Sequence, residues 1–141
     1  MTARAQLFFS PSPVTLRVQP EVSLISVVDD DNSIRESLQG LLASIGFAVE
    51  TFSSAQAFLD SEGHTRSDCL ILDVRMPGMW GPDLQRELAR RKCHTPIVFI
   101  TAHGDEHVRP RVLSDGAVDC LLKPFTEEAL LKAIRTALPL S

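Results

Sequence analysis

Short apolar runs alternate with amphipathic segments along most of this chain of 141 residues. The runs end near residues 28, 52, 72, 100 and 122, and each is followed by a stretch with helical spacing of its apolar residues. A short apolar run bounded by turn signals is typical of a strand that is buried on both faces. Five such strands alternating with five helices predict one α/β domain with a parallel sheet, helices on both faces and right-handed crossovers.

The helical segments carry start and stop signals. Asp31 or Asn32 can cap the first helix, Gly46 can end it, and Thr126 can cap the last helix near residues 126–138. The segment 105–115 predicts a poorer helix because it contains a proline. Proline in a helix interior removes a hydrogen bond and clashes with the preceding turn.

That proline is Pro110. We therefore expect the fourth helix to start late, near Val108 or Arg109, or to be distorted.

Residues 1–22 differ from the rest of the chain. Pro11, Pro13 and Pro20 indicate a flexible, extended N-terminal arm, and residues 23–141 form the expected domain. Because apolar and polar residues alternate over 14–18, a short edge strand is an alternative for that part of the arm.

Composition excludes several function classes. The net charge of −4 gives no reason to expect direct nucleic-acid binding, and no apolar stretch approaches the ~20 residues that cross a bilayer. Three cysteines without a paired spacing fit a reducing compartment. We therefore expect a cytoplasmic protein.

Polar side chains stand where the apolar runs end. Asp29 and Asp30 follow the first run, Asp73 the third, Thr101 the fourth and Lys123 the fifth. The carboxyl ends of parallel strands share one edge of a sheet, where ligands bind in open α/β folds. Carboxylates, a hydroxyl and an ammonium at one edge suit a divalent cation and a phosphoryl group.

Four motifs now support a family resemblance. They are Val27-Val28-Asp29-Asp30, the stretch Leu72-Asp73-Val74-Arg75-Met76-Pro77-Gly78, Ile100-Thr101-Ala102 and Lys123-Pro124-Phe125. In this order and spacing they resemble the receiver domain of two-component response regulators, and His103-Gly104-Asp105 after Ala102 is most similar to the FixJ/NodW-type branch. The resemblance covers roughly residues 23–138. It implies a flavodoxin-like, CheY-like fold with strand order 2-1-3-4-5.

The resemblance also implies roles for the polar residues. Asp73 would be the phosphoryl acceptor, and Asp29, Asp30, Asp73 and the backbone carbonyl of Arg75 would bind Mg²⁺. The expected donor is a sensor histidine kinase or a phosphotransfer protein.

Two further residues would act on the phosphoryl group itself. Thr101 would donate its hydroxyl to one phosphoryl oxygen, and Lys123 would contact another. The bond from Lys123 to Pro124 is often cis in this family, which would direct the lysine into the site.

The chain departs from the family at the positions that read out the signal. Receivers usually carry tyrosine or phenylalanine three residues before the lysine, and here that residue is Cys120. Together with Pro110, it puts the usual output face in doubt. We therefore expect a monomer or a weak dimer.

Several readings of the function stay open. The chain is either a stand-alone receiver or a part of a longer transcriptional regulator. The main alternative is a degenerate receiver that acts as a phosphorylation-independent interaction module. An aspartyl-phosphate phosphatase would need a second acid two residues after the nucleophile, where this chain has Arg75, so we expect no enzyme of that kind. A nucleotide binder would need a glycine-rich loop after the first strand, where Asp29 and Asp30 stand instead.

Overall fold

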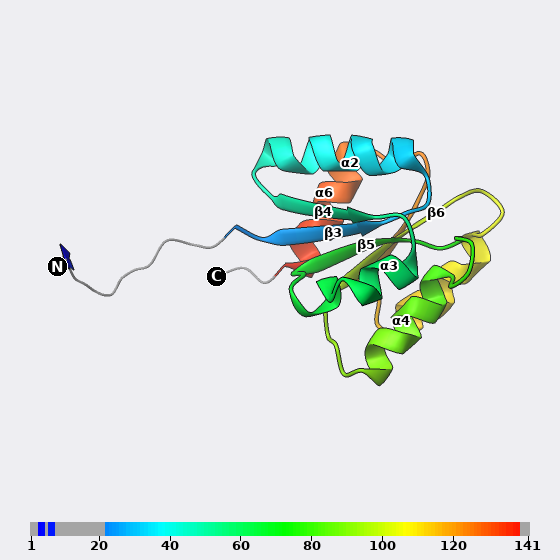
Figure 1. The fold of residues 1–141 in the computed structure, drawn as a ribbon. Coiled ribbons are helices and arrows are strands. Elements are labelled where there is room, and N and C mark those ends of the chain that lie inside the picture. The colour runs from blue at the N-terminus through cyan, green and yellow to red at the C-terminus, as the bar shows by residue number, and fades with distance from the viewer. Residues whose placement is uncertain (1–2, 5, 8–21, 139–141) are drawn as a thin grey trace.

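The computed structural model describes residues 3–4, 6–7 and 22–138 (Figure 1). The possible edge strand over 14–18 lies outside these residues, and the expected boundary near residue 22 stays a prediction. Two strands of two residues each, β1 (Ala3–Arg4) and β2 (Gln6–Leu7), pair in parallel near the N-terminus.

The domain is built on a five-stranded parallel sheet. Its strands are β3 (Leu24–Val28), β4 (Ala48–Phe52), β5 (Cys69–Asp73), β6 (Ile97–Thr101) and β7 (Asp119–Leu122). They lie in the order β4-β3-β5-β6-β7. Numbered along the domain, this is 2-1-3-4-5, so the predicted doubly wound architecture is confirmed.

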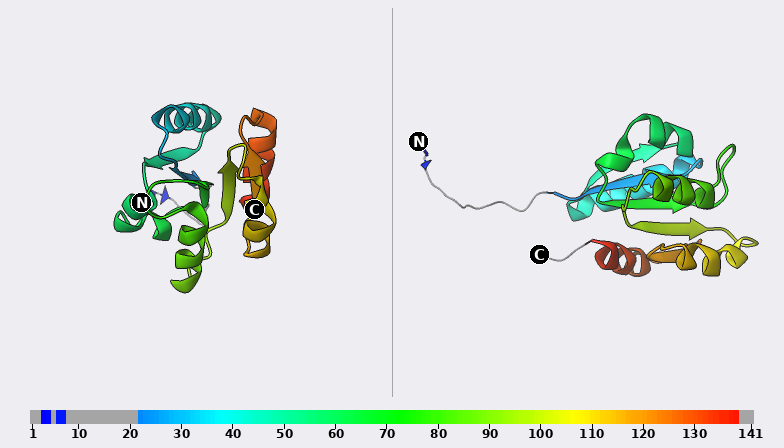
Figure 2. Two further views of the ribbon diagram at one scale, coloured as in Figure 1. Left: turned by 90° about the vertical axis from the view of Figure 1, so that its right-hand side faces the viewer. Right: turned by 90° about the horizontal axis from the view of Figure 1, so that it is seen from below.

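Five α-helices cover the sheet on both sides (Figure 2). They are α2 (Asn32–Ile45), α3 (Ala55–Asp60), α4 (Gly81–Arg90), α5 (Arg109–Ser114) and α6 (Glu127–Ala137), with 3₁₀ turns η1 (Gly63–Thr65) and η2 (Glu106–Val108). The two faces of the sheet carry separate cores. One core packs α2 and α6 against the sheet, and the other packs α3, α4 and α5.

The strand register explains the two cores. Val27 pairs with Ile71, and Ile71 pairs with Val98; all three belong to the core under α2 and α6. The next row, which contains Leu72 and Phe99, belongs to the other core. Successive residues of a strand point to opposite faces, so strands covered on both sides are largely apolar, as the sequence predicted.

The predicted helix ends are largely confirmed. The Asp31 carboxylate accepts the backbone N–H groups of Ser33 and Ile34, and Gly46 ends α2 in the left-handed conformation with φ 115°. The Thr126 hydroxyl accepts a backbone N–H at the start of α6.

The predicted fourth helix, which is α5 in the structure, does start late. It begins at Arg109, which places Pro110 in its first turn, where proline is tolerated because the first N–H groups have no partner in the helix. The preceding residues form the 3₁₀ turn η2. Pro110 therefore sets the beginning of α5 and does not interrupt it.

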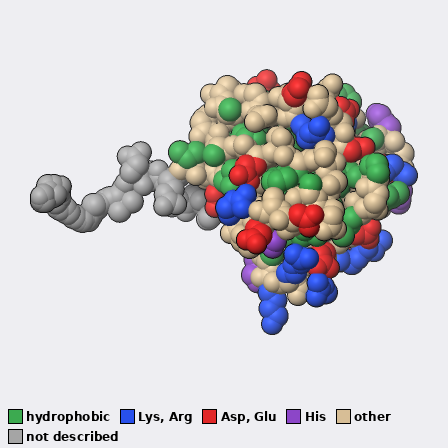
Figure 3. Space-filling view, in the orientation of Figure 1, with side chains coloured by type: hydrophobic (Ala, Val, Ile, Leu, Met, Phe, Trp, Pro, Cys, Tyr) green, Lys and Arg blue, Asp and Glu red, His purple; other side chains and the backbone are tan. Residues whose placement is uncertain are grey.

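The outer face of α4 carries charges of both signs. Arg86 pairs with Asp83, while Arg90 and Arg91 pair with Glu87. Figure 3 shows basic and acidic side chains next to one another at the lower end of the molecule. Exposed pairs of this kind contribute little stability, typically ~0–1 kcal/mol each.

Among residues 22–138, no helix combines the length and the apolar character needed to span a bilayer.

Candidate functional site

The polar residues predicted to meet do lie at one edge of the sheet. All strands of the five-stranded sheet point the same way (Figure 1). Asp29 directly follows β3, Asp73 and Thr101 are the last residues of β5 and β6, and Lys123 directly follows β7. The parallel topology therefore delivers side chains that are far apart in the sequence to the same place.

Three carboxylates form a compact cluster. Asp29, Asp30 and Asp73 each offer an oxygen, and these oxygens lie within 4.8 Å of one another. Asp29 is fully buried and Asp73 is 6% exposed, whereas Asp30 is exposed. Hard carboxylate oxygens with one side open to water suit Mg²⁺, which binds few carboxylates and keeps several waters. Residues 22–138 contain no other metal-ligand group of this kind built from His, Cys, Asp or Glu.

Lys123 supplies the positive charge of the cluster. Its Nζ lies 3.2 Å from Asp29 Oδ2 and 3.5 Å from Asp73 Oδ1. Burial favours the neutral amine, but the charges and hydrogen bonds of Asp73 and Asp29 outweigh it, so the pKa of Lys123 lies above its ordinary value. The bond to Pro124 is cis, as the resemblance implied.

The Asp73 carboxyl is the electrostatically perturbed acid of the site. Burial disfavours its ionised form, and the neighbouring Asp29 adds repulsion, while Lys123 acts in the opposite direction. The net result raises the pKa of Asp73 to about 7. Bringing a cation to the cluster would relieve this repulsion, so the site favours cation binding.

Two side-chain contacts hold the backbone around Asp29. Asp29 Oδ1 accepts the N–H of Asp31 at 2.9 Å, and Arg35 Nη1 donates to the Asp29 carbonyl at 2.7 Å. Sequence reasoning missed Arg35. Its place in the first turns of α2, six residues after Asp29, is the signal that could have identified it.

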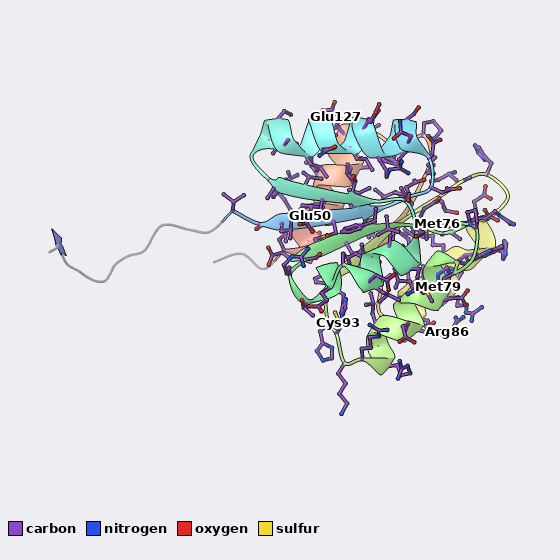
Figure 4. All side chains as sticks on the ribbon, in the orientation of Figure 1. Glu50, Met76, Met79, Arg86, Cys93 and Glu127 are labelled. Atoms are coloured by element: carbon purple, nitrogen blue, oxygen red, sulfur yellow. The ribbon has the colours of Figure 1, made fainter. Side chains whose placement is uncertain are left out.

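Gly81 is a second residue that sequence reasoning missed. A Cβ atom at this position would lie 2.3 Å from the Asp73 carbonyl oxygen and 2.9 Å from a ring carbon of Phe99. The Gly81 N–H donates to the Val74 carbonyl at 2.8 Å, so the start of α4 rests directly on the end of β5. Met76 and Met79, labelled in Figure 4, lie in the loop that this contact closes. Only glycine allows such a close approach.

Thr101 is buried at the end of β6, with 2% of its surface exposed. Its hydroxyl donates a long hydrogen bond of 3.4 Å to the Ala102 carbonyl. A bond of this length is weak, so the hydroxyl can turn to a better acceptor.

Arg75 lies two residues beyond Asp73. Its side chain reaches the loop after β6, where Nη2 lies 2.6 Å from Asp105 Oδ1 and Nε lies 3.2 Å from Oδ2. The Arg75 hydrogen bond holds the pKa of Asp105 below its ordinary value. The sequence analysis assigned a role only to the backbone carbonyl of Arg75, and the reach of its side chain was not foreseen.

An open, mainly apolar cleft of about 410 Å³ lies beside Lys123. Its lining consists of Ile34, Ala102, His103, Lys123, Pro124 and Phe125. His103 is largely exposed at the rim, as expected for a loop residue. The cleft joins the first turn of α2 to the loops that follow β6 and β7.

Cys120 lies inside the core, with 3% of its surface exposed. Burial raises the pKa of its thiol. It pairs in register with Phe99 and packs on the side of the sheet that α3, α4 and α5 cover. The thiol therefore behaves as a small apolar side chain, as the sequence predicted.

Comparison with known proteins gives one consistent family match. Residues 25–135 match the family model of the response regulator receiver domain. The response regulator protein TmoT of Ectopseudomonas mendocina is 52% identical over 119 residues, which are 84% of this chain and 54% of that protein. Nodulation protein W of Bradyrhizobium diazoefficiens is 47% identical over 115 residues, covering 82% of this chain and 51% of that protein.

Solved structures give the same result. The response regulator StyR matches with a TM-score of 0.78 and 49% identity, over 84% of this chain and 60% of that chain. The resemblance to the FixJ/NodW-type branch is thus confirmed. This chain spans about half the length of the curated relatives that it matches.

Proposed function

We propose that this chain, which belongs to the response regulator receiver domain family, accepts a phosphoryl group on Asp73 in two-component signal transduction. The observation that carries the proposal is the cluster at one sheet edge, where Lys123 Nζ contacts both Asp29 and Asp73. A third carboxylate, Asp30, lies beside these two, and a purely structural ion pair has no need of it, because like charges repel and buried charges are costly.

The donor set fits Mg²⁺. The carboxylates of Asp29, Asp30 and Asp73 would hold it, with the backbone carbonyl of Arg75 as a further oxygen ligand. When bound, the ion neutralises charge on the carboxylates and on the phosphoryl oxygens.

The residues of the chain supply the remaining chemistry. An oxygen of the Asp73 carboxylate attacks the phosphorus of a phosphohistidine. The bond from phosphorus to the histidine nitrogen breaks, and its electron pair stays on the leaving imidazole. An acyl phosphate remains on Asp73. Lys123 neutralises one phosphoryl oxygen, and the Thr101 hydroxyl donates to another. Alignment and charge stabilisation are the main requirements of phosphoryl transfer.

The donor we propose is the phosphohistidine of a sensor histidine kinase or of a phosphotransfer protein. Receiver domains are phosphorylated by histidine kinases. The apolar cleft between Ile34 and Phe125 borders Lys123, so a partner helix seated there would bring its histidine close to Asp73.

A second candidate function is an interaction module that works without phosphorylation. Cys120 favours it, because this small, buried side chain replaces the aromatic residue that usually reports phosphorylation. The proposed monomer or weak dimer is compatible with both functions.

Intact mass measurement after incubation with acetyl phosphate tests the proposal. We expect one phosphoryl adduct on the folded protein with Mg²⁺, and none with a chelator or in Asp73→Asn. A folded wild-type protein that forms no adduct would favour the interaction module.

A further inference from the structure

Two loops border the proposed phosphorylation site. One follows Asp73 and spans residues 74–80, and the other follows Thr101 and spans residues 102–105. The Arg75 guanidinium joins them through two hydrogen bonds to the Asp105 carboxylate, of 2.6 Å and 3.2 Å. A two-point contact between a guanidinium and a carboxylate fixes orientation as well as distance.

The Asp105 end of this link is firmly anchored. Its carboxylate is only 6% exposed, so rotation into water is restricted. Its N–H donates to the Ala102 carbonyl at 3.1 Å, and its own carbonyl accepts the N–H of Val108 at 3.1 Å. A force on the Asp105 side chain therefore reaches the whole turn that follows Thr101.

The Arg75 end is held within its own loop. The guanidinium carbon lies 4.4 Å from the centre of the Trp80 ring, a distance at which cation and ring attract each other. The Trp80 N–H donates to Asp83 Oδ2 at 3.3 Å, which fixes the entry to α4. The side chain of Arg75 is thus fixed from both sides, although it is 59% exposed.

We propose that Arg75 is a positioning residue. Its side chain holds the loop after Thr101 against the loop after Asp73, and we call its contact with Asp105 the clamp. The clamp fixes the backbone turn that follows Thr101 relative to the loop that follows Asp73, while the Thr101 hydroxyl is left free to turn toward its acceptor. This inference rests on the proposed function for its kinetic consequence. Its structural consequence, a more rigid loop over residues 102–108, is independent of phosphorylation.

Two charge-removing variants test the clamp against simple electrostatics. Arg75→Gln and Asp105→Asn both break the two-point contact, so each should slow adduct formation from acetyl phosphate by about threefold, the scale of an ion pair whose guanidinium is largely exposed. The double variant should be no slower than either single one. If only long-range charge mattered, loss of Arg75 would slow the reaction with this anion and loss of Asp105 would speed it. Opposite or additive effects would overturn the clamp.

Hydrogen exchange of the protein without a phosphodonor gives the second readout. The amides of Asp105 and Val108 should exchange about threefold faster in both single variants. Arg90→Gln, which breaks an exposed ion pair with Glu87 on α4, is the matched control and should leave these amides unchanged. Unchanged exchange in Arg75→Gln and Asp105→Asn would overturn the clamp even if the wild-type protein is phosphorylated. Faster exchange in a protein that forms no adduct would support the clamp and refute the proposed function.

Discussion

The Lys123 ammonium lies 3.5 Å from Asp73 Oδ1, although 50 residues separate the two in the sequence. The contact exists because β5 and β7 are parallel and end at the same edge of the sheet. Asp29 contacts the same ammonium, so one cation is shared by two buried carboxylates. The site is therefore short of positive charge, and the first three predictions follow from that shortage.

Replacing Asp73 should stabilise the protein at neutral and higher pH. The pKa of Asp73 is about 7 in the folded chain, well above its ordinary value, so the folded state binds the proton more tightly than the unfolded state. The stability that this carboxyl contributes is present below about pH 4 and is lost as pH rises through about 7. Without metal at about pH 8, Asp73→Asn should raise the free energy of unfolding by roughly 1–3 kcal/mol. Urea unfolding with a chelator present measures this, and a gain that does not shrink toward about pH 4 would contradict it.

Magnesium binding should compete with a proton. Because the Asp73 carboxyl must be ionised to bind the ion, the apparent dissociation constant should rise about tenfold between about pH 8 and about pH 6. Isothermal titration calorimetry measures the constant directly. Asp73→Asn should bind Mg²⁺ more weakly and with little dependence on pH. A constant that stays flat in the wild-type protein over this range would show that Asp73 is not a ligand.

Lys123→Met should slow phosphorylation of Asp73 far more than the same substitution of a surface lysine. Removal of one preorganised donor to a transferring group typically costs a factor on the order of a hundred. Time courses of the adduct with acetyl phosphate and Mg²⁺ give the rate. The matched control is Lys132→Met, an exposed lysine on α6, which should react like the wild-type protein. Equal rates in the two variants would remove Lys123 from the mechanism.

Gly81→Ala should destabilise the protein by roughly 1–3 kcal/mol, because the new Cβ would lie 2.3 Å from the Asp73 carbonyl oxygen. Gly40→Ala is the matched control within a helix. Nothing lies within 4 Å of a Cβ at that position, so alanine should stabilise the protein by roughly 0.5–1 kcal/mol. Urea unfolding distinguishes the two, and a Gly81→Ala protein as stable as the wild type would refute the close contact.

Local patterns in the sequence predicted the parallel sheet and the meeting of the acids, whereas the strand order was implied by the family resemblance. Buried parallel strands are largely apolar, and their ends carry polar residues such as Asp73. The late start of α5 was also predictable, since Pro110 is tolerated only in the first turn.

The contacts that the sequence did not reveal are those between loops. Arg75 and Asp105 are 30 residues apart, and no periodicity links a residue after β5 with one after β6. Gly81 was missed because its role depends on the distance between α4 and the Asp73 carbonyl, which only the packed structure defines.

The first measurement to make is tandem mass spectrometry of the chain after phosphorylation by acetyl phosphate and rapid digestion. We predict a phosphoryl group on the peptide that contains Asp73, and its release by hydroxylamine, because an acyl phosphate is cleaved by this nucleophile. A phosphoryl group on a serine, threonine or histidine, or one on this peptide that resists hydroxylamine, would contradict the assignment of Asp73 as the acceptor.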